Sequence, residues 1–274
     1  MPPVRLKSWY YQQFDADFAR DVPGEGYGGW KSAELPLAPD KTALVVMHAW
    51  DCGTREQYPG WHRAVEYLPR SYEICRTVFP SLLGAVRRSP LKLYHVVSTA
   101  AYCRSYAGFR RTLSLAGPPG PRPPTVAADP VLNELRTFRR DYSFPGKDNI
   151  PDIEKGSPRL AFPREAEPQG EEGIAENGEQ LYALCHADGV NHLVYAGFAI
   201  NWCLLMSPGG MMEMSRYGIM CSALRQAVTA VENRETARKE LNKELGLWRV
   251  SIAFGMVYDV ADFVRAVSQA GGAS

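Results

Sequence analysis

Apolar and polar residues alternate in blocks along this chain, and the blocks predict strands followed by helices. Continuous apolar runs, typical of strands buried on both faces of a sheet, occupy residues 42–48, 91–98 and 192–196. Shorter strands are predicted at 159–162, 217–222 and 250–254. Helical spacing predicts helices within 60–88, where Pro69 and Pro80 break or kink the pattern, and at 176–187, 203–216, 235–245 and 260–268. This order predicts an α/β fold, a three-layer sandwich with a mainly parallel central sheet and helices on both faces.

Two segments do not follow the alternation. Residues 1–40 are aromatic and Gly-rich without a clear period, so we expect an N-terminal arm that packs on the domain formed by residues 41–274 or on a partner subunit. Residues 104–157 form an insertion, in which the Pro-rich stretch 117–124 excludes regular structure and a short helix is predicted at 131–138 beside a basic cluster. Because the insertion carries apolar residues to bury, it is interpreted as a lid or an interface arm.

The composition of the chain excludes several classes of protein. The 274 residues are 45% hydrophobic and 22% charged, as in an ordinary globular chain, and the formal net charge is +1. Such a charge recruits neither nucleic acid nor a membrane surface, and no apolar run is as long as a membrane span. The N-terminus lacks the apolar stretch of a signal peptide. The six cysteines form no CxxC pair, so we expect reduced thiols and a cytoplasmic location.

The segment from Gly197 to Cys203 is the part of the chain that indicates chemistry. An apolar strand ends at Gly197, and a short turn leads to Cys203 at the start of a predicted helix. A helix N-terminus favours the thiolate form of a cysteine, and its free N–H groups can stabilise an oxyanion. The competing interpretation is a small buried residue at a helix end, which is what most cysteines are.

The pattern of Gly197, Ala199, Cys203 and Ser207, followed by a Tyr-Gly turn at 217–218, resembles the isochorismatase-like cysteine hydrolase superfamily, which includes nicotinamidases and N-carbamoyl amidohydrolases. With the surrounding strands and helices, the resemblance covers residues 42–230. It implies that Cys203 is the nucleophile and that a cis peptide bond precedes Ala199. It further implies an oxyanion hole made of the N–H groups of Ala199 and Cys203, and assembly into a dimer or tetramer.

The chain departs from the family pattern at two catalytic positions. The family has an Asp at the end of the first strand and a Lys after the third, whereas this chain has His48 and, on the predicted strand order, Arg164. In one hypothesis His48 takes the Cys203 proton, and Arg164 holds the thiolate or the substrate carbonyl by its charge. In the other, the site is degenerate, and the protein binds a small molecule or builds an assembly.

Aromatic residues on loops after the strands, Trp50, Tyr102 and Trp202, are expected to line a pocket for a small-molecule substrate. Residues 98–104 contain neither carboxylate nor imidazole where nicotinamidases place metal ligands, so no metal and no other cofactor is expected. The sequence thus predicts a cysteine hydrolase, an amidohydrolase that cleaves a non-peptide C–N bond through a Cys203 thioester. The alternative is a non-catalytic binding or assembly protein.

Overall fold

The computed structural model describes residues 1–120 and 124–272, and these residues build one sheet with the order β2-β1-β8-β7-β6-β3-β4-β5. Its parallel strands are β3 (Thr42–Met47), β4 (Lys92–Val96), β5 (Gly173–Ala175), β6 (His192–Phe198), β7 (Met220–Thr229) and β8 (Val257–Tyr258). The strands β1 (Val4–Gln12) and β2 (Gly29–Leu37) form a hairpin that pairs antiparallel with β8.

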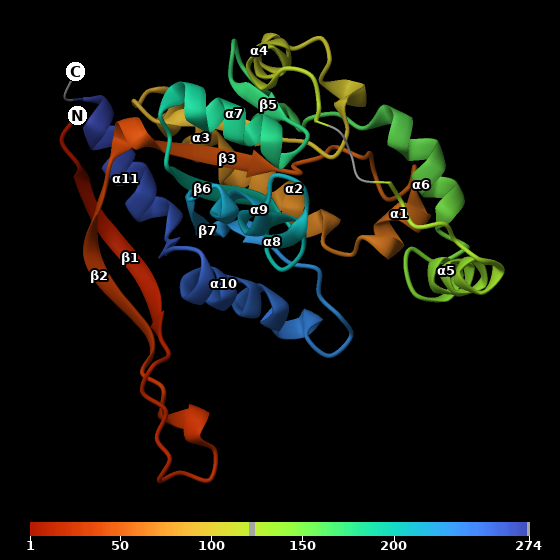
Figure 1. Ribbon diagram of the computed structural model, residues 1–274, viewed down its shortest axis with the longest axis horizontal. Helices are drawn as coiled ribbons and strands as arrows, with labels where there is room; N and C mark the ends of the chain where they lie inside the picture. Colours follow the sequence, from red (N-terminus) through yellow and green to blue (C-terminus); the bar gives the residue numbers. More distant parts are fainter. Residues whose placement is uncertain (121–123, 273–274) are drawn as a thin grey trace.

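Side chains of the central strand β3 alternate between two hydrophobic cores, one on each face of the sheet. Leu44 and Val46 join the core under α2 (Leu68–Thr77), α3 (Phe79–Arg87) and α11 (Val260–Gly271). Val45 and Met47 join the core under α7 (Gly178–Asp188), α8 (Cys203–Met206), α9 (Met211–Arg216) and α10 (Leu241–Ala253). Helices therefore cover both faces (Figure 1), which confirms the predicted three-layer α/β fold.

Prolines divide the helical segment after β3 as predicted. The segment contains α1 (Pro59–Ala64), α2 and α3, and each of them has a proline in its first turn. A proline is tolerated there because the first N–H groups of a helix have no partner within it. The connection from β4 to β5 contains α4 (Ala107–Ala116), α5 (Pro130–Tyr142) and α6 (Ile150–Gly156). Short 3₁₀ helices complete the fold: η1 (Pro23–Gly26), η2 (Pro39–Lys41), η3 (Ala100–Tyr102), η4 (Ser157–Arg159), η5 (Arg164–Ala166) and η6 (Ala237–Lys239).

Three of the predicted secondary-structure elements differ from the structure. Residues 159–162 form no strand; they contribute the end of η4 and one bridge between Ala161 and Asp51, and the strand that follows the insertion is β5. The helix predicted at 203–216 is broken into α8 and α9 around Gly209, whose φ of 79° leaves the helical region. Residues 250–253 form the last turn of α10 and Phe254 is its C-cap, so this segment is not a strand.

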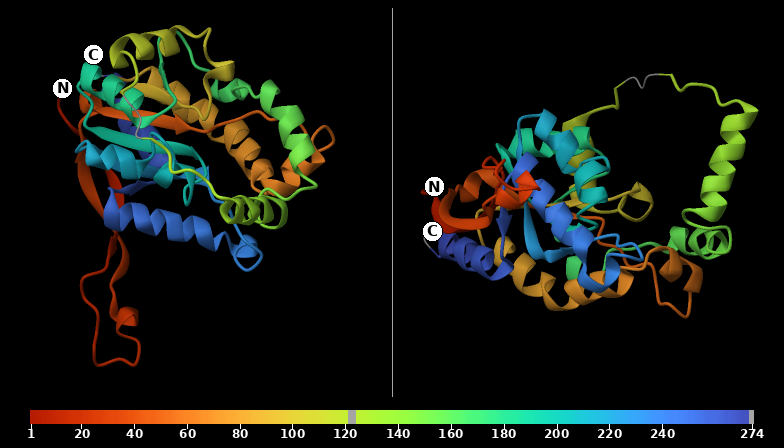
Figure 2. Two further views of the ribbon diagram at one scale, coloured as in Figure 1. Left: turned by 45° about the vertical axis from the view of Figure 1, so that its right-hand side comes forward. Right: turned by 90° about the horizontal axis from the view of Figure 1, so that it is seen from below.

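The N-terminal segment and the insertion also take shapes that the sequence did not specify. Residues 1–40 supply β1 and β2, and the loop joining them projects from the body (Figures 1 and 2). The insertion carries the predicted helix as the longer α5, whose N-cap Asp129 accepts a hydrogen bond from the backbone N–H of Leu132 at 2.8 Å. In the Pro-rich stretch, residues 117–120 and 124 are irregular, and residues 121–123 lie outside the described part.

Candidate active site

His48 lies directly after β3 at the carboxyl edge of the sheet. Its φ of 52° is in the left-handed region, and its N–H donates to the carbonyl of Val96 on the neighbouring strand at 2.9 Å. The imidazole is 6% exposed and stacks on the Trp50 indole, with 5.4 Å between ring centroids. The backbone geometry therefore ends the strand and turns the His48 ring into the protein.

Burial makes His48 a neutral side chain. It lowers the pKa of the imidazole to about 4, and among the described residues no charged group adds to this shift. The Asp51 carboxylate, three residues further on, accepts the N–H of Gly53 at 2.9 Å in the following loop. The Nδ1 atom of His48 and the Nε1 atom of Trp50 are buried without a partner in the described chain. Buried polar atoms of this kind are uncommon and indicate a place where a ligand can supply the hydrogen bond.

The turn that carries Cys203 begins where β6 runs beside the end of β3. Gly197 pairs with Met47, and a Cβ at position 197 would lie 1.9 Å from the Met47 carbonyl oxygen, so only glycine fits. The peptide bond from Phe198 to Ala199 is cis, as the resemblance implies. This close approach places the start of the turn against the residue that precedes His48.

Cys203 is the first residue of α8, and its thiol is partly exposed, whereas the other five cysteines are buried. The N–H groups of Trp202 and Leu204 both donate to the carbonyl of Ala199, at 3.2 and 3.1 Å, which closes the turn around the thiol-bearing residue. The four residues of α8 are too few for a substantial helix dipole. The predicted stabilisation of a thiolate by a long helix therefore does not hold.

Hydrogen bonds from the segment after β7 hold this turn in place. The Asn201 side chain donates to the Val231 carbonyl and accepts the Val231 N–H, both at 2.9 Å. The N–H of Ile200 donates to the carbonyl of Thr229 at 2.8 Å. On the other side, α10 packs so tightly that a Cβ at Gly246 would lie 3.0 Å from the Ile200 side chain. The backbone leading to Cys203 is thus fixed from two directions.

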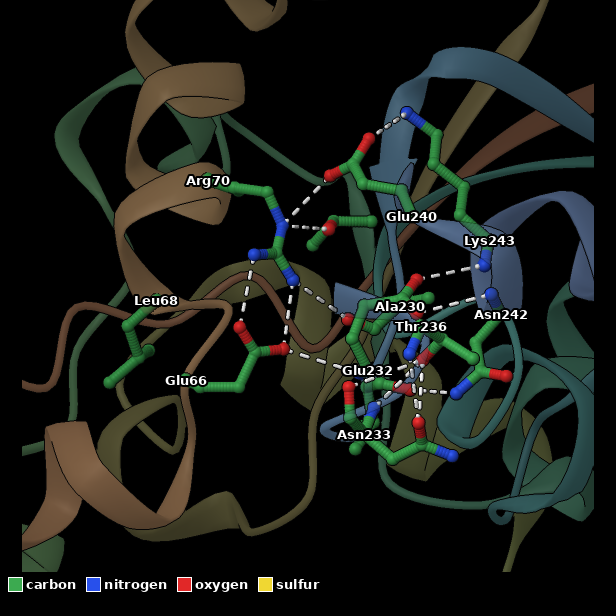
Figure 3. Close-up of polar contacts among 12 residues, drawn as sticks. Glu66, Leu68, Arg70, Ala230, Glu232, Asn233, Thr236, Glu240, Asn242 and Lys243 are labelled. Atoms are coloured by element: carbon green, nitrogen blue, oxygen red, sulfur yellow. Dashed lines mark hydrogen bonds and ion pairs between the residues drawn. The ribbon is translucent and has the colours of Figure 1, made fainter. Parts of the chain in front are cut away.

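An ion-pair network fastens the same segment to α2 (Figure 3). The Arg70 guanidinium donates two hydrogen bonds to the Glu66 carboxylate, at 3.0 and 2.8 Å, one to Thr229 Oγ1 at 3.0 Å and one to the Ala230 carbonyl at 3.3 Å. Its Nε also lies 2.9 Å from the Glu240 carboxylate. The network therefore connects α2, the end of β7 and the start of α10 behind the Cys203 turn.

Tyr67 is a neighbour of Cys203 that sequence analysis missed. It precedes α2 and is buried. Burial raises the pKa of its phenol, and the nearby Cys203, Cys52 and Glu66 raise it further. The hydroxyl therefore remains protonated and can donate a hydrogen bond to a thiolate or an oxyanion. No local pattern distinguishes this tyrosine from the other aromatic residues between 58 and 72.

Of the predicted pocket residues, Trp202 and Trp50 lie beside the catalytic candidates. Trp202 precedes Cys203 and is 49% exposed, and the ring of Phe144, from the insertion, lies 6.4 Å from it. Phe144 is a second residue near the candidate site that sequence analysis did not identify as a pocket residue. Tyr102 packs edge-on against Phe162 at 5.0 Å, and its hydroxyl is buried without a partner in the described residues. It lies on η3, after β4, at the same edge of the sheet.

Arg164 was assigned a catalytic role because it follows the strand predicted at 159–162, and the structure has no strand there. The third parallel strand along the chain is β5, which Glu176 directly follows, so Arg164 is not the residue that follows that strand. Arg164 is exposed on η5 and lines a hollow of about 680 Å³ with Asp51 and Cys75, while neither His48 nor Cys203 lines that hollow. Burial, together with Glu165 and Asp51, raises the pKa of the Cys75 thiol to about 12, so that thiol is unreactive.

The described residues hold no group of three or more His, Cys, Asp or Glu side chains placed to bind a metal ion. In residues 1–120 and 124–272, every helix is too short or too polar to cross a membrane.

Sequence comparison finds no protein-family model that matches the chain and no similar curated protein. Solved structures are similar in overall shape at low identity. A cysteine hydrolase from Pseudomonas syringae pv. phaseolicola 1448A is 13% identical, with 86% of this chain and 96% of that one covered and a TM-score of 0.47. A hydrolase of the isochorismatase family from Chromobacterium violaceum is 16% identical, with 86% and 98% covered and a TM-score of 0.46. An isochorismatase family protein from Burkholderia thailandensis is 13% identical, with 85% and 98% covered and a TM-score of 0.42.

Proposed function

We propose that this protein is a metal-independent hydrolase that cleaves an amide or carbamoyl C–N bond of a small molecule, with Cys203 as nucleophile and His48 as base. The observation that carries the proposal is the partly exposed Cys203 thiol on a rigid cis-peptide turn, which starts beside the strand end that bears a buried, neutral imidazole. A neutral imidazole can accept a proton, which an imidazolium cannot.

In the proposed reaction, His48 takes the thiol proton, and Cys203 Sγ attacks the carbonyl carbon. The negative charge that develops on the carbonyl oxygen is stabilised by the N–H groups of Ala199 and Cys203. The C–N bond then breaks, the amine leaves with the proton held by His48, and a thioester remains. Water attacks the thioester and releases the acid, which restores the thiol. The Tyr67 hydroxyl is suited to donate to the thiolate or the oxyanion, because its pKa is raised.

The pocket residues point to the kind of substrate. Trp50 stacks on His48 and Trp202 precedes Cys203, so both offer flat apolar surfaces, and the Trp50 Nε1 and Tyr102 hydroxyl, which have no partner among the described residues, offer hydrogen bonds. Such a lining suits a small, flat acyl group with one or two polar atoms. All six cysteines are unpaired, which fits a protein kept reduced in the cytoplasm.

A second function, binding without catalysis, is favoured by one specific observation. Burial lowers the pKa of His48 to about 4, and no carboxylate among the described residues opposes this shift, so proton transfer from Cys203 is uphill in the free protein. In that case the chain is a binding or assembly protein on the same scaffold, and Cys203 behaves as an ordinary thiol.

Thiol alkylation as a function of pH separates the two functions. A paired Cys203 reacts well below the free-thiol pKa of about 8.5, and His48→Asn removes that reactivity. Asn is chosen because it tolerates the left-handed backbone at position 48. Cys203→Ser reports the background from the buried thiols, and His186→Asn, at an exposed position of α7, is the matched control. An alkylation profile that is ordinary in the wild type and unchanged in His48→Asn contradicts the hydrolase and supports the binding protein.

The proposal includes assembly into at least a dimer, because the insertion and the hairpin loop leave large apolar side chains exposed. Light scattering tests it: a mass near 30.5 kDa, the mass of one chain, contradicts assembly without bearing on the chemistry of Cys203.

A further inference from the structure

Helix α5 is an amphipathic helix that the described chain leaves uncovered. None of its thirteen residues is buried. Val131, Leu135, Phe138 and Tyr142 follow one another at intervals of four, three and four residues, so they form a single stripe along the helix, and each is 63–68% exposed. Figures 1 and 2 show α5 held away from the sheet and its covering helices. An apolar stripe of this kind is typical of a surface that another protein covers.

The loop of the N-terminal hairpin is the second uncovered apolar element. Residues 13–28 join β1 to β2 and extend far beyond the sheet (Figure 1). Phe14 and Phe18 are 84% and 86% exposed there, and Val22 is exposed as well. Hydrogen bonds within the loop give it a defined shape, because Asp15 accepts the Gly28 N–H at 3.2 Å and Asp17 accepts the Ala19 N–H at 3.0 Å.

The two elements carry opposite charge. Residues 13–28 contain four acidic side chains and one Arg, whereas residues 130–147 contain four basic side chains and two acidic ones. Arg139 lies one helical turn after Leu135, and the Lys147 ammonium lies 5.8 Å from the Tyr142 ring, so positive charge borders the apolar stripe. Complementary charge around a desolvated apolar centre favours one partner over others.

We infer that the hairpin loop of one copy binds helix α5 of a second copy, with Phe14 and Phe18 against the stripe of Leu135, Phe138 and Tyr142. The inference rests on the proposed assembly and assigns the surfaces that build it. If each of the four aromatic rings buries about 150 Å², one contact covers about 600 Å². Two such contacts in a symmetric pair cover about 1,200 Å², the lower limit of stable interfaces.

Complementation between two variants tests the contact. Phe14→Ala with Phe18→Ala disables the loop, and Leu135→Ala with Phe138→Ala disables the helix while keeping a good helix former. Each variant alone is expected to be monomeric by light scattering. An equimolar mixture restores one of the two contacts, because the intact loop of one variant meets the intact helix of the other, so the mixture associates more strongly than either variant alone and more weakly than the wild type. Val126→Ala, at an exposed apolar position outside both surfaces, is the matched control and assembles like the wild type.

A charge exchange provides the second measurement. Arg139→Glu with Lys147→Glu weakens association at least tenfold, and adding Asp21→Lys with Glu25→Lys to the same chain restores it. Three results overturn the inference: either apolar variant assembles like the wild type, the mixture associates no more strongly than either variant alone, or the fourfold charge variant associates no better than the twofold one. A wild type that is itself monomeric refutes the proposed assembly as well, whereas an unchanged assembly in the variants refutes only these surfaces.

Discussion

His48 combines two properties that oppose each other in a general base. It is neutral and therefore able to accept a proton, but the burial that keeps it neutral also makes the imidazolium costly. In the reaction that we propose, formation of the Cys203 thiolate beside the imidazolium would offset that cost, since opposite charges attract strongly where water is excluded. A reactive pair therefore depends on the two groups changing charge together, and Tyr67 is the neutral donor able to support the anion.

Burial of His48 also predicts how stability depends on pH. Its folded pKa of about 4 lies below its ordinary value of 6.5, so the unfolded chain takes up a proton as the pH falls through 6.5 while the folded chain does not until about 4. The contribution of His48 to stability is therefore complete above pH 6.5 and is lost toward pH 4, by about 2 kcal/mol between pH 8 and pH 5. Urea unfolding of His48→Asn at both pH values is expected to show a loss about 2 kcal/mol smaller than that of the wild type. An equal loss in the two proteins means that the ring is solvated.

Two elements, the turn after β6 and the segment after β7, form one unit through Asn201. The side-chain amide of Asn201 forms hydrogen bonds with both the N–H and the carbonyl of Val231. The Arg70 network holds Ala230, just before Val231, and Glu240, at the start of α10 (Figure 3). A nucleophile is most effective when its backbone is held rigidly before the substrate arrives. Asn201 is therefore a positioning residue that acts on Cys203 through the backbone.

Asn201→Ala is expected to loosen the turn without unfolding the protein. Loss of the two hydrogen bonds costs about 2 kcal/mol, which raises amide hydrogen exchange in residues 199–204 by about tenfold or more. The low-pH alkylation of Cys203 is expected to disappear with it. Asn201→Asp keeps the acceptor for the Val231 N–H and should restore part of both. Asn233→Ala is the control, because among the described residues that side chain accepts hydrogen bonds from Glu235 and Thr236 alone, within the loop. If Asn201→Ala leaves exchange and alkylation at wild-type values, Asn201 does not position the nucleophile.

The elements that sequence analysis predicted best are those with strong local patterns. The strands β3 and β6 are continuous apolar runs, and Gly197 and Cys203 stand at the ends of a recognisable turn. The three-residue β5 is too short to show a pattern, and its absence from the prediction shifted the third strand to 159–162 and the catalytic assignment to Arg164. The end of α10 was interpreted as a strand because a short apolar run does not distinguish the two structures. Tyr67, Phe144 and Asn201 depend on contacts distant in sequence, which no local pattern contains.

At the scale of the molecule, a regular body carries two irregular extensions. The body is the sheet with helices on both faces, and the extensions are the hairpin loop and the insertion with α5 (Figure 2). Although the formal net charge is only +1, charged residues are unequally distributed, because the hairpin loop is acidic and the α5 segment is basic. Apolar side chains exposed on both extensions bury little surface within the single chain, which is the reason that we propose a role for them in association.

Shortening the hairpin separates folding from association. Gln12 pairs with Gly29 across β1 and β2, so an Asn-Gly dipeptide in place of residues 13–28 closes the hairpin with a favoured two-residue turn. The main loss within the single chain is the hydrogen bond from Trp248 Nε1 to Gln13, worth about 1 kcal/mol, while the removed Phe14 and Phe18 are exposed. We expect the melting temperature to fall by only a few degrees, about 2–4 °C per kcal/mol for a chain of this size, and light scattering to report a monomer. The contrary result is a shortened chain that still assembles like the wild type, because the hairpin loop then has no part in the interface.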